Sequence, residues 1–299
     1  MTLAWHALIN SRSWQHPGFA PYWPILRRLR LMAQSSVPAA ERGGDTPGLL
    51  AADPQEPSAW QCADWLDALN RLAVWRGLVN ARGVKLRFVA GGDASALDYE
   101  SRILEAGEIA CRTAGAGARH DFHNALVWLR FPRLKGAFNE LHCEQGQDMA
   151  SSGGSPLSSA HRGRGYRRDA ITLLDEGGAI WPAPATAWVE ALQARQWARL
   201  FGQYRAALHP RFAPVIIGHG LLEKLHRPYK SMTAKLLVCT SPRTGLDRGA
   251  ALQVRDMAAA DIFRPRVLVP MPIQGWPGWD PANDSPDFYQ DTSVFRLPR

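Results

Sequence analysis

The sequence predicts an α+β fold that is mainly helical, with a few short strands and with irregular segments rich in proline and tryptophan at both ends. Two observations predict this mixture. Several segments repeat apolar residues at three- and four-residue spacing, which is the period of a helix with one buried face. Others are short runs rich in β-branched residues between glycines and prolines, which is typical of strands. No fixed-period repeat is present.

Composition places the chain among ordinary globular proteins. Its 299 residues, 46% hydrophobic and 21% charged, can bury a sizeable core in one large domain or two ordinary ones. The formal charge of +8 permits binding to nucleic acid, an anionic membrane or phosphorylated ligands. Because much of the excess is arginine, a coding bias toward that residue is the plainer explanation of the charge.

The first part of the chain differs from the rest. Residues 37–58 are dense in proline, glycine and alanine, which is typical of a loop or linker. The segments beside it are too short for an independent core. We therefore expect residues 1–57 to form an irregular arm and linker packed on the body, and residues 58–299 to form a single α+β domain.

Cysteine usage and the N-terminus favour a soluble, cytoplasmic protein. No two cysteines have the spacing of a zinc ribbon or a redox motif, and their wide scatter fits free thiols in a reducing compartment. The N-terminus lacks the uninterrupted apolar region and the cleavage site of a signal peptide. No stretch approaches the length of a membrane span. The cysteines are Cys62, Cys111, Cys143 and Cys239.

Three elements are expected early in the body. Ser58 is predicted to cap a helix that places Trp65 and Leu69 on one face. Residues 84–92 alternate in polarity and predict a short strand. Residues 98–113 predict a short helix ended by glycine, followed by an extended run.

The stretch from Arg119 to His142 predicts two helices, the first starting near Asp121. Pro132 ends the first helix and begins the second, because proline lacks the amide hydrogen that a helix interior needs but a first turn does not. Residues 146–168, rich in serine and glycine, are expected to form a mobile loop.

Residues 170–184 predict a strand, a turn at the DEGG motif and a second strand, with a helix ending at the glycines as the alternative. Residues 186–208 predict one amphipathic helix. The apolar run after Ala213 is expected to become helical by Leu221, and residues 234–240 predict a strand. Prolines in the C-terminal tail exclude regular structure over most of its length.

The candidate site residues are polar groups scattered along the chain, and the first of them lie at the start of the first central helix. His120 and Asp121 form a doublet in which an imidazole beside a carboxylate can bind a divalent cation or exchange protons. His219 and Glu223, four residues apart, share a helix face and can add two ligands, or one ligand and one base. The candidate catalytic residues are His120, Asp121, Asn124, His219 and Glu223, and the candidate metal ligands are His120, Asp121, His142 and Asp169.

Each candidate also has a purely structural interpretation. Asp121 can cap or charge the first turn of its helix, whose N-terminus favours a carboxylate. Asn124 can satisfy a buried carbonyl, and His142 can complement the C-terminal end of its helix. Asp175 and Glu176, in the DEGG motif, are interpreted as turn residues.

The densest positive cluster consists of Arg162, Arg164, Arg167 and Arg168. Arginine presents a planar fork that suits phosphate or carboxylate, so the cluster can close over an anionic ligand. The alternative is that these side chains are solvated or paired with Asp169 and other nearby acids.

Common catalytic signatures, namely a phosphate loop, a dinucleotide-binding glycine motif, HExxH and a nucleophile elbow, are absent. One hypothesis is an enzyme that acts on a phosphorylated or nucleotide-like substrate through His120 and Asp121, with a divalent metal as its candidate cofactor. The other is a non-catalytic protein that binds nucleic acid or an anionic small molecule through the Arg162–Arg168 cluster. The first hypothesis requires His120 and His219 to lie within about 15 Å of each other, in one pocket.

Several longer motifs resemble one bacterial family. They are YESRI, HDFHNALVWLRFPRLKGAFNELH, RRDAITLLDEGG, GHGLLEKLHRPYKSMTAK and GWPGWDPANDSPDFYQDTSVFR. From about Trp60 to Arg299 the chain is similar to the DUF3025 family, a domain of unknown function, so the resemblance implies no reaction, cofactor or site. Where that family has WHDFFNAL this chain has ARHDFHNAL, which argues that His123 is not a required ligand. The serine- and glycine-rich segment before Arg162 resembles an insertion.

Overall fold

The computed structural model describes residues 5–35, 65–91, 98–151, 159–239 and 245–297, without the side chains of residues 145–151 and 159–164. The helices are α1 (Trp5–Ile9), α2 (Trp23–Ser35), α3 (Trp65–Trp75), α4 (Tyr99–Ala106), α5 (Gly115–Arg130), α6 (Pro132–Ser151), α7 (Ser159–Gly177), α8 (Thr186–Gln193), α9 (His219–Lys224) and α10 (Leu246–Ala259). The strands are β1 (Arg87–Ala90), β2 (Glu108–Cys111), β3 (Gly178–Trp181), β4 (Val215–Ile216), β5 (Thr233–Val238) and β6 (Val269–Pro272).

Two small sheets accompany the helices, which confirms the mainly helical α+β fold. Strands β1 and β2 pair in parallel, with Phe88 opposite Ile109. The second sheet has the order β4-β3-β5-β6, in which β3 and β5 are parallel and the two outer strands are antiparallel to their neighbours. All four residues of β3 are buried, as expected for an inner strand.

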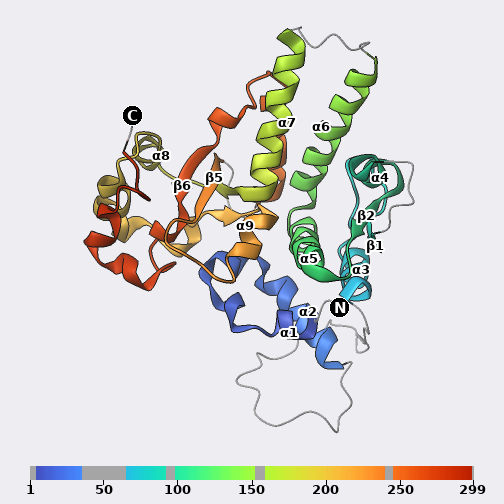
Figure 1. The fold of residues 1–299 in the computed structure, drawn as a ribbon, viewed down its shortest axis with the longest axis horizontal. Coiled ribbons are helices and arrows are strands. Elements are labelled where there is room, and N and C mark those ends of the chain that lie inside the picture. The colour runs from blue at the N-terminus through green and yellow to red at the C-terminus, as the bar shows by residue number, and fades with distance from the viewer. Residues whose placement is uncertain (1–4, 36–64, 92–97, 152–158, 240–244, 298–299) are drawn as a thin grey trace.

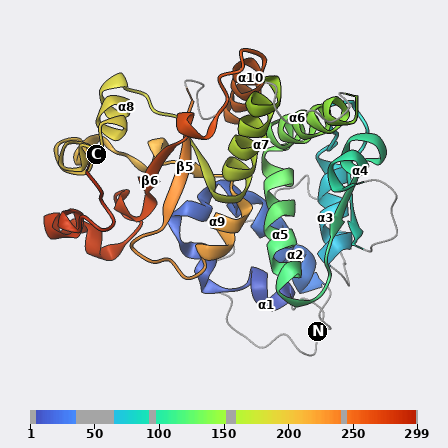
Figure 2. The ribbon, with the colours of Figure 1, turned by 45° about the horizontal axis from the view of Figure 1, so that its top comes forward.

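The helices that carry the candidate residues pack around one region. Helices α6 and α7 stand next to each other between the four-stranded sheet and the β1–β2 unit, and α9 packs on both α5 and α7 (Figure 1). Turning the molecule shows α5 beside α9, with the end of α7 above them (Figure 2). Segments separated by about a hundred residues in the sequence are therefore neighbours at this point.

The break between α5 and α6 falls at Pro132, as predicted. Phe131, with φ −127° and ψ 57°, leaves the helical region because a residue before proline is disfavoured there. The new helix receives a cap from far along the chain, since the Asp247 carboxylate of α10 accepts hydrogen bonds from the amides of Arg133 and Leu134 at 3.2 and 2.9 Å.

The N-terminal segment packs into the same hydrophobic core as the rest of the described residues. It consists of short turns, in which Trp14, Phe19 and Tyr22 are buried, followed by α2, a regular helix that the sequence analysis did not predict. The Tyr22 hydroxyl donates a hydrogen bond to the carbonyl of Ile216 in β4, at 2.7 Å. The three described cysteines are buried thiols, and Cys62 lies outside the described residues.

Three predictions about the central helices are wrong. Helix α5 begins at Gly115, so Asp121 lies in its second turn and does not cap it. Residues 146–168 are not one loop, because α6 continues to Ser151 and α7 begins at Ser159. His142 therefore lies inside α6 and not at its end, and the interpretation as a C-terminal charge is wrong. Residues 152–158 and the predicted cap Ser58 lie outside the described residues.

Two further predictions fail downstream. The strand–turn–strand prediction for residues 170–184 is wrong and its alternative is confirmed, since α7 ends at the glycines and only β3 follows. The single helix over residues 186–208 is also interrupted: α8 ends at Gln193, Arg195 takes a positive φ of 51°, and a separate turn with π-type hydrogen bonds follows. The proline-rich tail does form one strand, β6, at the edge of the sheet where proline is tolerated.

Candidate metal centre

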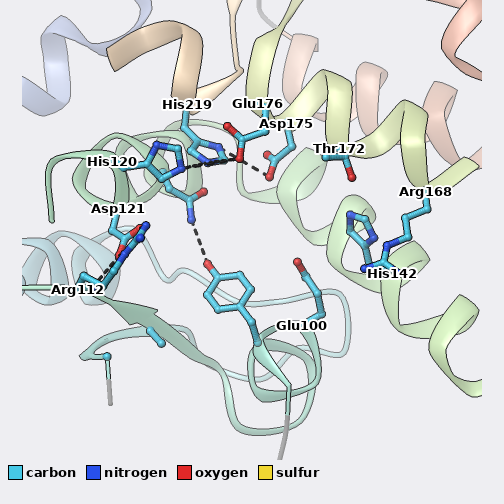
Figure 3. A pocket seen from close by; sticks show the side chains of 14 residues that line it. Glu100, Arg112, His120, Asp121, His142, Arg168, Thr172, Asp175, Glu176 and His219 are labelled. Atoms are coloured by element: carbon cyan, nitrogen blue, oxygen red, sulfur yellow. Dashed lines mark hydrogen bonds and ion pairs between the residues drawn. The ribbon is translucent and has the colours of Figure 1, made fainter. Parts of the chain in front are cut away.

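Two histidines and a glutamate from three helices meet at one point. His120 of α5 and His219 of α9 face each other with 2.9 Å between their Nε2 atoms. Glu176, near the end of α7, places its Oε1 3.3 Å from His219 Nε2 and 3.8 Å from His120 Nε2. Among the described residues, these are the groups that could hold a metal ion together. Figure 3 shows the three side chains converging from separate helices.

The spacing of the three ligand atoms fits a metal ion. With separations of 2.9, 3.3 and 3.8 Å, the three atoms lie on a circle with a radius of about 2.0 Å, which matches the usual bond length from zinc to imidazole nitrogen or carboxylate oxygen. Two imidazoles and one carboxylate form the donor set of several catalytic zinc sites, and also of non-haem iron sites. An ion held by three protein ligands keeps coordination positions for water or substrate.

Glycines next to His219 allow this approach. A Cβ atom on Gly220 would lie 2.7 Å from Glu176 Oε2 and 3.1 Å from the Glu176 carbonyl oxygen. A Cβ on Gly218 would overlap the backbone of Glu176 and Gly178. The start of α9 can therefore contact the end of α7 only because neither position carries a side chain.

Further carboxylates lie behind the imidazoles. Glu223, one turn along α9 from His219, accepts a hydrogen bond from His120 Nδ1 at 3.3 Å. His120 Nδ1 then carries its hydrogen and Nε2 keeps the lone pair that a metal needs. His219 Nδ1 has no hydrogen-bond partner among the described residues, and Asp175 Oδ2, at 3.8 Å, is too distant for a hydrogen bond.

The charges around the centre favour a cation. Lys135 and Asp175 form a buried ion pair at 2.6 Å. Burial alone would raise the pKa of Asp175, but the charge of Lys135 and then that of His219 outweigh it and lower the pKa. The hydrogen bond with His219 lowers the pKa of Glu176. Within the described part of the chain, no lysine or arginine pairs with Glu176 or Glu223, so two carboxylates face the imidazoles unneutralised.

The three candidate ligands line a cleft of about 470 Å³. Glu100 of α4 lines its opposite wall; burial raises the pKa of this carboxyl, and a hydrogen bond from Asn139 Nδ2 at 2.7 Å partly offsets the rise. Asn124 donates a hydrogen bond from Nδ2 to the Tyr99 hydroxyl at 3.0 Å, while its buried Oδ1 has no partner among the described residues. Glu100 therefore places a carboxyl group across the cleft from the His–His–Glu cluster (Figure 3).

Asp121 lines the same cleft but points away from the imidazoles. Its carboxylate accepts hydrogen bonds from Arg112 Nε at 2.8 Å and Arg112 Nη2 at 2.7 Å, and another from the Arg112 amide at 2.6 Å. This bidentate pairing ties the start of α5 to the end of β2 and occupies both oxygens of the carboxylate. The structure thus places Asp121 in a different interaction from its sequence neighbour His120.

The other predicted residues are divided between the cleft and the surface. His142 of α6 and Arg168 of α7 line the cleft at the end away from His120, whereas Asp169 is exposed and does not line it. Arg167 donates a hydrogen bond to the carbonyl of Ala258 at 3.0 Å. The side chains of Arg162 and Arg164 lie outside the described residues.

Sequence reasoning missed Glu176, because its motif was interpreted as a turn. The helix alternative carried the necessary signal, since α7 places Arg168, Thr172 and Glu176 at four-residue spacing on one face. Glu100 and Arg112 carried no comparable signal, because a lone acid or a lone arginine has no spacing to interpret.

The fold and the site together define a mainly helical α+β protein with a His–His–Glu cluster that lines a cleft. Residues 86–299 match the family described as "Protein of unknown function (DUF3025)", so the chain belongs to the DUF3025 family, as the longer motifs indicated. Comparison with curated proteins and with solved structures gave no match. None of the described helices is both long and apolar enough to cross a membrane.

Proposed function

We propose that this protein is a metal-dependent hydrolase that acts on a phosphorylated substrate. The observation that carries the proposal is the circle of about 2.0 Å radius on which His120, His219 and Glu176 place their ligand atoms. A purely structural hydrogen-bond network is the other explanation of these contacts. It does not explain why Glu176 and Glu223 face two imidazoles with no lysine or arginine among the described residues to balance their charge, whereas a bound cation does.

The proposed chemistry divides the work between the ion and the protein. His120, His219 and Glu176 would hold a divalent ion, which would supply Lewis-acid chemistry by lowering the pKa of a bound water. Glu223 holds His120 in the tautomer that binds metal, because it accepts the hydrogen from Nδ1. Glu100, across the cleft, is the proposed general acid that protonates the leaving group, since burial raises its pKa.

Metal analysis of the purified protein tests the proposal. We expect about one equivalent of zinc per chain, and His219→Ala should lose it together with any hydrolytic activity. His209→Ala is the matched control, because His209 is an exposed histidine outside the cleft and should leave the metal content unchanged. A protein that binds no divalent ion in calorimetric titration would refute the proposal, and iron in place of zinc would replace hydrolysis with oxygen chemistry.

The alternative function, nucleic-acid or anion binding by the Arg162–Arg168 cluster, remains a prediction. It requires polynucleotide binding that weakens steeply with added salt. Binding that is indifferent to salt would rule it out.

A further inference from the structure

Helix α7 runs along the cleft, and its lining residues differ in chemistry between the two ends of the cleft. Glu176 belongs to the ligand cluster, Thr172 lies one turn before it, and Arg168 lies one turn further back. Eight residues of helix span about 12 Å along its axis. The arginine therefore stands two turns from the metal ligand but lines the same cleft.

The far end of the cleft offers hydrogen-bond donors. Arg168 lies next to His142 of α6, and its charge is among those that act on the imidazole (Figure 3). Burial is the main cause that lowers the pKa of His142, so the ring is neutral near pH 7 and keeps one N–H donor. The Thr172 hydroxyl is a third potential donor on this wall.

These donors have no acceptor in the described structure. No hydrogen bond or ion pair of Arg168 or His142 is found among the described residues, in contrast with Arg112, whose guanidinium is occupied by Asp121. Arg168 is thus the one lining arginine whose charge is not neutralised within the described part of the chain. A planar guanidinium beside an imidazole N–H and a hydroxyl matches an oxyanion with several acceptor oxygens.

We infer that this end of the cleft is a phosphate-binding subsite in which Arg168 and His142, with Thr172, hold a phosphate monoester. The phosphate subsite is inferred from the residues that line it. Its position relative to the hydrolysed bond rests on the proposed function. Because the two ends are separated by two turns of α7, the phosphate is an anchor and not the group attacked. The substrate class is then an organic phosphate whose hydrolysed bond lies roughly 10 Å from the phosphorus atom.

Calorimetric titration of the chelator-treated, full-length protein with inorganic phosphate tests the subsite without a metal. We expect Arg168→Ala to weaken phosphate binding at least about tenfold, because it removes the unpaired guanidinium. Arg248→Ala, which removes an exposed arginine of α10 outside the cleft, is the charge-matched control and should bind as the unaltered protein does. Glu176→Gln should also keep phosphate binding. Equal weakening by the two arginine variants, or no weakening by Arg168→Ala, would overturn the subsite.

A second measurement gives the distance between the metal at the His–His–Glu cluster and the phosphorus of the bound phosphate. With Co²⁺ at the ligand cluster, paramagnetic relaxation of the ³¹P signal of phosphate should report a separation of roughly 10 Å, as two helical turns require. A separation of about 3 Å would mean that phosphate binds the metal directly and would refute the anchor. Failure of the proposed function is visible separately, since the protein would then bind no Co²⁺ but would still bind phosphate through Arg168.

Discussion

Single side chains decide how the imidazoles of the candidate centre are oriented. Glu223 fixes one tautomer of His120 through a hydrogen bond of 3.3 Å, although it does not face the ligand nitrogen itself. Gly220 acts by having no side chain, because any Cβ there would press on the Glu176 carboxylate. Neither residue is a proposed ligand. Variants of Glu223 and Gly220 therefore test how the ligands are positioned while all three ligands are kept.

Glu223→Ala is expected to weaken metal affinity by about 10- to 100-fold, the usual cost of losing a partner that orients a histidine ligand. Competition with a metal-binding dye measures the change. Glu190→Ala, an exposed position on α8, should leave the affinity unaltered. If both variants bind metal equally well, Glu223 does not position His120.

Gly220→Ala should lower metal affinity while the protein stays folded. The new methyl group would lie 2.7 Å from Glu176 Oε2, so the carboxylate must move away from the imidazoles. We expect a loss of about tenfold, or roughly 1.4 kcal/mol. Gly202→Ala is the control, because a Cβ at Gly202 meets nothing within 4 Å. Metal affinity that is unchanged in Gly220→Ala would contradict this role of Gly220 in positioning Glu176.

At the scale of elements, a second pair of histidines, His123 and His226, joins α5 to the turn that follows α9. His123 Nδ1 lies 2.7 Å from the Arg119 carbonyl oxygen and must donate to it, so Nε2 accepts. His226 Nε2 then donates to His123 at 2.9 Å, which leaves His226 Nδ1 to accept from the Ser13 hydroxyl at 2.5 Å. The Arg119 carbonyl thereby determines the direction of every hydrogen bond in this series. The series ties the N-terminal segment to α5 and to the turn after α9.

This network predicts a pH dependence of stability. Burial, the main cause in both rings, lowers the pKa of His123 to about 3 and that of His226 to about 4. The unfolded chain takes up protons near the ordinary histidine pKa of about 6.5, so the unfolding free energy should fall as the pH drops from 6.5 toward 4. Urea denaturation at several pH values measures the slope.

The variant His123→Gln should flatten that slope, because it removes one of the two groups whose protonation favours the unfolded state. Its amide oxygen can still accept the hydrogen from His226, so the fold is expected to survive. His209→Gln, at an exposed turn, should keep the original slope. An unchanged slope in His123→Gln would show that this imidazole is not held neutral by burial.

At the scale of the whole molecule, the residues that match the family do not form the core alone. The match begins at residue 86, yet Trp14, Phe19 and Tyr22 are buried in the common core. Tyr22 contacts β4, and Ser13 contacts His226, just after the helix that carries His219. The N-terminal segment therefore contacts the chain just before and just after α9, the helix that carries His219.

Phe19→Ala should destabilise the protein by about 3–5 kcal/mol, the usual cost of deleting a buried aromatic ring. Phe19 has no exposed surface, so the substitution leaves a cavity. Val74→Ala, at a side chain that is 81% exposed, should change the unfolding free energy by less than about 0.5 kcal/mol. A similar melting temperature for both variants would show that the N-terminal segment is only laid on the surface.

The sequence by itself determined the elements whose signals are local. Periodicity predicted the mainly helical fold, and Pro132 fixed the break between α5 and α6 because proline acts on its own neighbours. Six residues in or next to the cleft were named from the sequence: His120, Asn124, His142, His219, Glu223 and Arg168. In our proposals all of them except Asn124 act as a ligand, an orienting group or an anion contact. The motifs also sufficed to indicate the DUF3025 family.

Only the tertiary structure decided which of those residues meet. Asp121 follows His120 directly, but a helix turns successive side chains by about 100°, so the aspartate reaches Arg112 and the histidine reaches His219. Glu176 joined the site because α7 continues through a motif that resembles a turn, and the glycines beside His219 let two helix ends touch. Contacts between groups about forty to a hundred residues apart depend on packing, which no local pattern of the sequence records.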